Sequence, residues 1–248
     1  MLPTPETHNP TDETRFRELS SEAIIETIEV LSQRIFERFP NSGLCGASKR
    51  LLSIGNQTKQ QIHTILRPIF LLRAGIVLLV SVIIVGIVGT IYTFEIPQSG
   101  FNLFNFIQVL EAGINDIVLI GALIFFLATF ELRIKRRRTL SAIHQLRSMA
   151  HIVDMLQLKK DPERVFSPEQ RTASSPAERF TAHELNRYLD YCSELLSLTG
   201  KLAALYAQHF NDAVVLAAVT EVEALTTNLE QKVWQKLMIL HAASQSSG

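Results

Sequence analysis

Two stretches of the chain are apolar over a length that matches a lipid bilayer. Residues 74–94 contain no charged side chain, and residues 117–134 carry only Glu131 and Arg133, both near the end of the run. A helix rises about 1.5 Å per residue, so the first stretch would measure about 30 Å, close to the thickness of the hydrocarbon core. The pattern therefore predicts two transmembrane spans.

The charges around the two stretches predict an orientation. The connecting segment 95–116 contains acidic residues but neither Lys nor Arg. Basic residues gather at the end of the second span, at Arg133, Lys135, Arg136, Arg137 and Arg138. Since short loops rich in Lys and Arg remain in the cytoplasm, the segment 95–116 is expected outside and both termini inside. This basic cluster is also expected to contact anionic lipid headgroups of the inner (plasma) membrane.

The external segment 95–116 has two interpretations. Phe101, Phe104 and Phe106 stand among aliphatic residues, as in a short helix that lies at the membrane surface. The same residues could line a pore as a re-entrant segment, with Glu111 and Asp116 at its outer mouth. The sequence leaves both interpretations open.

Helical periodicity dominates the remainder of the chain. Residues 1–19 are polar and predicted to form a disordered tail. Residues 20–70 are expected to form two cytoplasmic helices, the first from Ser20 and the second over 47–70. The apolar stripe of the first helix consists of Ile24, Ile28, Leu31 and Ile35. Residues 139–160 keep an apolar face, which predicts that the second span continues as a helix into the cytoplasm.

A C-terminal helix pair follows a linker predicted over 161–180, which is rich in Pro, Ser and Thr. Thr181 and Glu184 have the spacing of a capping box, which marks a helix start. The Asn211-Asp212 turn then predicts an antiparallel helical hairpin over 181–243. Gly200 argues against one unbroken helix before that turn, because glycine disfavours helix interiors.

Together these elements predict an all-α fold. No segment alternates convincingly as a strand. We therefore expect a two-span transmembrane helical hairpin with a cytoplasmic helical bundle, and the C-terminal antiparallel helix pair belongs to that bundle.

One polar stripe stands out on the helix after the second span. Its residues follow one another at intervals of three, four and three positions, on one side of the helix: His144, Arg147, His151 and Asp154. Leu140 and Leu158 lie in line with them, which suggests a helix buried on most sides. The stripe then forms a satisfied internal network or an interface with another chain.

Two further interpretations of this stripe are an anionic ligand or headgroup site and a metal or proton site. His144 and His151 lie about 10 Å apart along one helix, so they cannot share a metal unaided. His151 and Asp154 would need ligands from elsewhere in the chain.

Composition and motifs exclude several classes of function. The 248 residues carry 24 basic and 24 acidic groups, and the basic run stands at a membrane border, so nucleic-acid binding is not expected. Cys45 and Cys192 are too few for a disulfide framework or a structural zinc site. No Gly-x-Ser-x-Gly elbow or phosphate loop is present, and no cofactor is expected.

Three functions remain as hypotheses. The leading one is a non-enzymatic interaction module (a scaffold, sensor or adaptor) that self-associates in the membrane and presents its helices to a cytoplasmic protein partner. The second is a subunit of an oligomeric pore or channel gated by the cytoplasmic bundle. The third and weakest is a metal- or lipid-dependent enzyme centred on His151 and Asp154.

Overall fold

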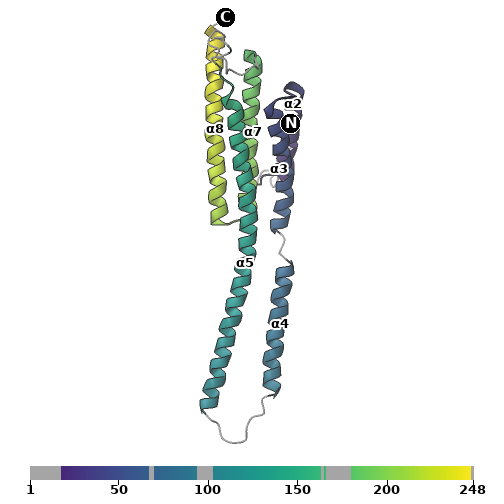
Figure 1. The fold of residues 1–248 in the computed structure, drawn as a ribbon, viewed down its shortest axis with the longest axis vertical. Helices are drawn as coiled ribbons and strands as arrows, with labels where there is room; N and C mark the ends of the chain where they lie inside the picture. The colour runs from purple at the N-terminus through teal and green to yellow at the C-terminus, as the bar shows by residue number, and fades with distance from the viewer. Residues whose placement is uncertain (1–17, 67–69, 94–102, 163–164, 166–179, 247–248) are drawn as a thin grey trace, which may run out of the picture. The chain divides into compact units, whose positions relative to one another are not determined.

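The computed structural model describes residues 18–66, 70–93, 103–162, 165 and 180–246 of the chain. Helices make up the regular structure of these residues, and no strand occurs among them, which confirms the all-α prediction. The helices, drawn in Figure 1, are α2 (Ser21–Arg38), α3 (Gly43–Leu66), α4 (Phe70–Thr93), α5 (Leu103–Leu158), α7 (Ala182–His209) and α8 (Ala213–Ser246). The predicted tail lies outside the described residues except for Glu18 and Leu19, and most of the predicted linker lies outside them too.

The chain divides into two compact units. One consists of Met1–Leu66 with Arg138–Gly248, and the other of Arg67–Arg137. We call the first the bundle and the second the apolar unit. Helix α5 contributes residues to both, because it continues without a break past the boundary.

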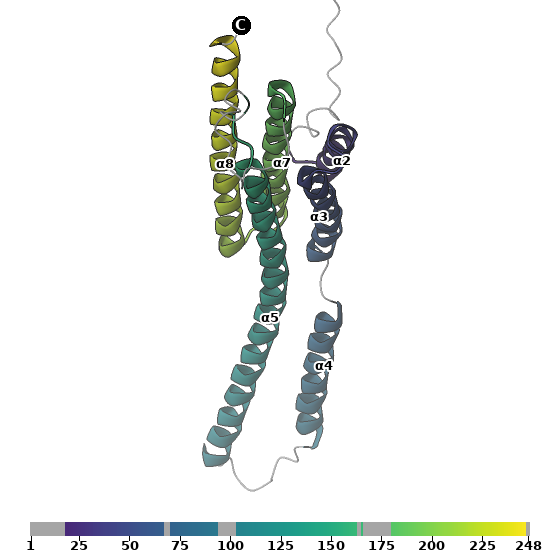
Figure 2. The same ribbon diagram turned by 45° about the horizontal axis from the view of Figure 1, so that its top comes forward.

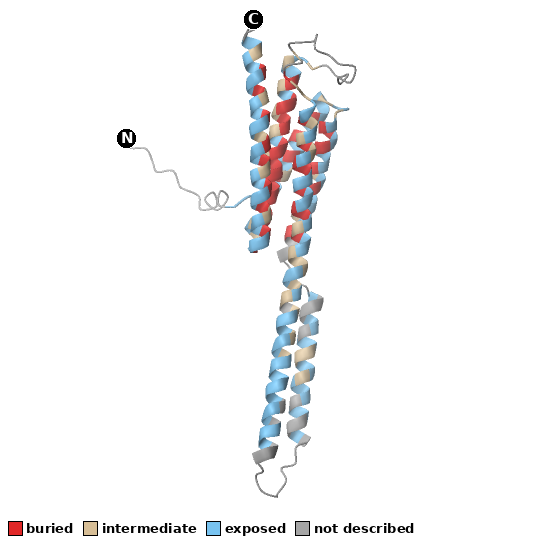
Figure 3. Ribbon diagram, turned by 60° about the vertical axis from the view of Figure 1, so that its left-hand side comes forward, coloured by how far each residue is buried: buried red, intermediate tan, exposed pale blue. Residues whose placement is uncertain are grey.

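The bundle has one apolar core shared by α2, α3, α7, α8 and the last part of α5. Figure 2 shows α2 beside α3, and α7 beside α8. In Figure 3 the buried residues concentrate on the faces that these helices turn toward one another. The largest fully buried side chains include Tyr188, Tyr206, Ile28, Leu31, Leu146 and Met149. Burial of such side chains is the main stabilising contribution to a bundle of this kind.

Helix α2 begins and ends where its local sequence dictates. The hydroxyl of Ser20 accepts a hydrogen bond from the Ala23 backbone N–H, at 3.3 Å, so one of the first free N–H groups is satisfied. The predicted stripe is buried at all four of its positions, Ile24, Ile28, Leu31 and Ile35. The helix ends at Arg38, ahead of Pro40.

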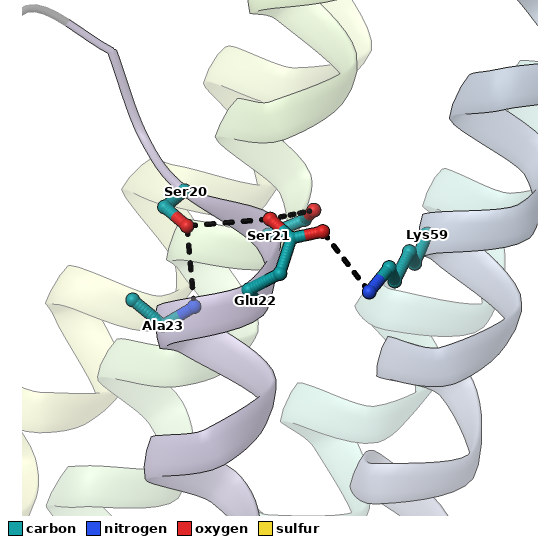
Figure 4. A network of polar contacts seen from close by, with 5 residues as sticks. All are labelled: Ser20, Ser21, Glu22, Ala23 and Lys59. Atoms are coloured by element: carbon teal, nitrogen blue, oxygen red, sulfur yellow. Dashed lines mark hydrogen bonds and ion pairs between the residues drawn. The ribbon is translucent and has the colours of Figure 1, made fainter. Parts of the chain in front are cut away.

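A polar network at the start of α2 ties this helix to α3, as Figure 4 shows. The carboxylate of Glu22 forms an ion pair with Lys59 at 3.0 Å and accepts hydrogen bonds from the hydroxyls of Ser20 and Ser21. The hydrogen bond from Lys59 and a backbone hydrogen bond lower the pKa of Glu22 to about 2. Because both side chains of the pair are exposed, its contribution to stability is small.

Helix α5 begins earlier than the sequence suggests. It starts at Leu103, so residues 103–116 of the predicted external segment are helical, but as a continuation of the second predicted span and not as a separate short helix. The physical reason is that this segment contains no proline, and Gly113 alone does not stop a helix. The rest of the predicted loop, residues 94–102, lies outside the described residues.

Helices α7 and α8 form an antiparallel pair, and each of the two helices is capped at its N-terminus. Thr181 and Glu184 make the capping box, with both of its hydrogen bonds present. The carboxylate of Asp212 accepts from the N–H groups of Val214 and Val215, at 3.1 and 3.2 Å, and so caps α8. The short loop between the helices consequently fixes both chain direction and register.

Gly200 does not interrupt α7, which runs unbroken past it. The residue is instead required by the contact with α8. A Cβ atom at Gly200 would lie 2.9 Å from the hydroxyl oxygen of Thr226, closer than real Cβ atoms approach. Thr226 is buried, and its hydroxyl donates to the carbonyl oxygen of Glu223 at 3.0 Å. The expectation of a broken helix was therefore wrong, because a close helix-helix approach outweighs helix propensity here.

Substitution of Gly200 by alanine is expected to destabilise the bundle by about 1 kcal/mol, because overpacking outweighs the gain in helix propensity. In a Thr226→Ala background the clash is gone, so Gly200→Ala is expected to stabilise by up to about 1 kcal/mol. Thermal unfolding of the full-length protein, followed through the fluorescence of Trp234, measures both changes.

Gly46→Ala is the matched control, since a Cβ at Gly46 meets nothing within 4 Å and the residue is exposed in α3. It should stabilise in either background. The same sign for Gly200→Ala with and without Thr226 would contradict the packing role.

Candidate functional site

The apolar unit exposes large hydrophobic side chains on both of its helices. In Figure 3 almost all of its described residues are exposed or intermediate. On α4 these side chains are Val77, Leu78, Val82, Ile84, Val85 and Val88. On α5 they include Ile117, Val118, Leu119, Phe125, Phe126 and Phe130. Soluble proteins rarely expose a contiguous apolar surface of this extent.

One stretch of the described residues, Phe106–Leu158 in α5, is long and apolar enough to cross a membrane. Its most apolar window has a mean hydropathy of 2.2, and none of that window is buried. A core helix of a soluble protein would be buried over such a stretch. A shorter apolar stretch, Val77–Gly86, lies in α4. The fold therefore points weakly to membrane association through α5.

The basic cluster follows the apolar part of α5 without a break in the helix. Arg133, Arg137 and Arg138 are exposed. Lys135 forms an ion pair with Glu131 at 2.9 Å, across one helical turn, and both side chains are less than one-fifth exposed. The acidic residue nearest to the cluster is thereby neutralised, and the exposed arginines retain a net positive charge at this level of the helix.

The polar stripe lies on the outer surface of the bundle. His144, Arg147 and His151 are exposed, and Asp154 is half-buried. The guanidinium of Arg147 pairs with Glu221 of α8 at 3.1 Å, and Asp154 accepts a hydrogen bond from the Gln157 side chain at 2.7 Å. The stripe thus contributes one link to α8, but its four residues do not converge on a common point.

The expectation that this helix is buried on most sides was wrong for the single chain. In the bundle, α5 buries one face, which includes Ile143, Leu146, Met149 and Val153. Leu158, expected to frame the stripe, is 64% exposed. The reason is that α5 borders the bundle and does not pass through its centre. No group of three or more His, Cys, Asp or Glu side chains among the described residues is arranged to hold a metal ion.

A polar centre that the sequence did not reveal lies at the end of α5. The ammonium group of Lys236 on α8 donates hydrogen bonds to the backbone carbonyl oxygens of Gln157 and Lys160, at 2.6 and 3.1 Å. Carbonyl groups in the last turn of a helix lack partners within the helix and carry partial negative charge, so a lysine there is favourable. Burial lowers the pKa of Lys236, while Asp161, Cys192 and Asp154 oppose that shift.

Aromatic rings and a second lysine pack against one another beside this centre. The Lys160 ammonium lies over the ring of Phe180, 4.0 Å from its centroid, and over Tyr188 at 5.0 Å. Phe39 packs edge-on against Tyr188, with 5.5 Å between ring centroids. Cys192 is fully buried nearby, and burial raises the pKa of its thiol to about 12, so it acts as a core residue and not as a nucleophile.

The one sequence signal for this centre was weak. Lys236 occupies the edge of the apolar face of α8, next to Val233 and Leu237. Many lysines stand at such edges with their ammonium groups in water. Its partners are carbonyl groups more than 70 residues away, whose position depends on how α5 and α8 pack.

A comparison of the chain with known protein families, with curated proteins and with solved structures finds no match.

Replacement of Lys236 by methionine is expected to destabilise the bundle by about 1–3 kcal/mol, because charge-assisted hydrogen bonds to the end of α5 are lost. Thermal unfolding of the full-length protein measures the change. Lys232→Met is the matched control, since Lys232 is an exposed lysine one turn earlier on the same helix. It should alter stability by less than about 0.5 kcal/mol. Equal effects of the two substitutions would contradict the capping role.

Proposed function

We propose that the chain is a two-span integral membrane protein that holds a non-enzymatic interaction module at the cytoplasmic surface. The spans are α4 and the apolar part of α5. The module is the helical bundle, which acts as a scaffold, sensor or adaptor. The single observation that carries the proposal is the exposed apolar surface of α4 and α5, bordered by the basic cluster.

A bilayer would give the exposed side chains of the apolar unit the apolar surroundings that water does not. Exposed valine, isoleucine and phenylalanine side chains favour transfer into the hydrocarbon core. A helix also satisfies its own backbone hydrogen bonds, as the core of a bilayer requires. Phe125 and Val85, each at least 70% exposed, represent the side chains that would face lipid.

The basic cluster supports the orientation. Exposed arginines at the end of the apolar run favour the cytoplasmic leaflet, where anionic headgroups concentrate. The ion pair with Lys135 neutralises the carboxylate of Glu131, which would otherwise be the charged group deepest in the bilayer at the cytoplasmic end of this span. The bundle would then lie in the cytoplasm together with both chain ends.

Two features support an interaction module. First, the stripe of His144, Arg147 and His151 is accessible to a cytoplasmic protein partner. Second, a Cβ atom added at Gly75 or Gly121 meets nothing within 4 Å, so packing inside one chain does not explain these two glycines. Small residues in spans allow close approach of another helix, which favours self-association.

Site-directed labelling tests the topology. Ser99→Cys, between the two spans, is expected to react with a membrane-impermeant maleimide on intact cells. Ser244→Cys, near the end of α8, is expected to react only after the cells are permeabilised. The wild type is the control, because both native cysteines, Cys45 and Cys192, are buried. Labelling of both sites on intact cells would rule out two spans, and labelling of Ser244→Cys alone would reverse the orientation.

Self-association is tested by the mass of the full-length protein in native-lipid particles. The proposal expects a small oligomer, in which the two-span hairpins pack through their glycine-bearing faces. A strict monomer would contradict self-association. A closed ring of several subunits would favour a pore instead, since two spans cannot enclose an aqueous path by themselves.

A further inference from the structure

The turn between α7 and α8 has an unusual surface. From Phe210 to Thr220 the sequence FNDAVVLAAVT contains one ionisable side chain, Asp212. That carboxylate is buried and accepts the hydrogen bonds that cap α8. The exposed surface of this segment, which we call the hairpin tip, therefore carries no charged group.

The hairpin tip is also apolar where it is exposed. Val214 is 46% exposed and Leu216 is 37% exposed, on two sides of the first turns of α8. Ala213, directly before Val214, and Ala217, directly after Leu216, are exposed as well. Leu19 adds a further apolar side chain, because its backbone is hydrogen-bonded to Gln208 directly before the tip.

Contacts within the bundle fix the level of the tip along α5. Arg147 contacts Glu221, and the carbonyl groups of Gln157 and Lys160 contact Lys236, so α5 and α8 run in the same direction. Val214 stands seven residues before Glu221, which corresponds to about 10 Å along the helix. The same distance back from Arg147 reaches residue 140 on α5, next to Arg138 and the end of the basic cluster.

A second contact places the tip at the same end of the bundle as the end of α3. The hydroxyl of Tyr206 donates to the side-chain oxygens of Gln61 at 2.8 Å and of Thr58 at 3.2 Å. From there α3 ends within about two turns, at Leu66. Both points at which the chain leaves the bundle for the apolar unit, after Leu66 and before Arg138, are therefore at the level of the hairpin tip (Figure 1).

We propose that the hairpin tip is a second membrane-binding surface, which inserts its apolar side chains into the headgroup region of the cytoplasmic leaflet. The inference rests on the proposed two spans, since these bring the bilayer to the level of Arg138. An uncharged tip suits this position, because apolar side chains gain by leaving water at the boundary of headgroups and acyl chains.

Fluorescence quenching of the full chain in phosphatidylcholine–phosphatidylserine vesicles tests this. A nitrobenzoxadiazole label is attached to Val214→Cys at the tip, to Met238→Cys as an exposed control farther along α8, and to Phe125→Cys in the proposed span. The buried native cysteines remain unlabelled. Nitroxides carried on the lipids are expected to quench Val214→Cys and Phe125→Cys several-fold more than Met238→Cys. Iodide in the water is expected to show the reverse order.

The outcomes separate the tip from the spans. If Val214→Cys behaves like Met238→Cys while Phe125→Cys is quenched from the lipid, the spans stand and the membrane role of the tip is overturned. If Phe125→Cys is also quenched by iodide and not by the lipid, the two spans are overturned and the inference falls with them.

Discussion

The apolar core of the bundle is the constraint on which the rest of the described structure depends. Its helices come from three separate parts of the chain, and none of them can bury its apolar face alone. Helix α7 supplies the central surface, with Tyr188, Leu195 and Tyr206 buried in contact with the rest of the core. The close approach of α8 at Gly200 then completes the core on that side. The surface features, including the polar stripe and the hairpin tip, take their positions from this packing.

Local features of the fold could be predicted from the sequence because their causes are local. The starts of α2 and α7 follow from Ser20 and from the Thr181–Glu184 box, each of which satisfies backbone groups a few residues away. The turn at Asp212 also has a local cause, because its carboxylate caps the backbone N–H groups two and three residues further on. The apolar stripe of α2 was identified by spacing alone, since one helix face must meet the core. The all-α class followed from the sum of such signals.

Features that depend on a distant partner could not be predicted in the same way. Gly200 looks like a helix breaker until Thr226 is placed opposite it. Lys236 looks like an ordinary surface lysine until the last carbonyl groups of α5 are placed beside it. The stripe of His144 and His151 was expected to be buried because leucines frame it, yet periodicity cannot tell a central helix from one at the border. The start of α5 was missed because a helix expected to lie separately at the membrane surface can equally be continuous with the span that follows it, when no proline stands between them.

The order in which the chain is synthesised has a bearing on how this bundle can form. Thr58 meets Tyr206 across a sequence separation of 148 residues, and Leu19 meets Gln208 across 189. The amino-terminal helices therefore emerge from the ribosome long before the surface that covers them exists. Residues 67–137 are synthesised in the interval, so the apolar unit is complete before α7 begins. During that time the faces of α2 and α3 that later pack against α7 stay exposed, which makes the nascent chain a target for chaperones and proteases. A truncation before α7 would leave those faces exposed permanently, and cellular quality control would treat the product as a misfolded protein.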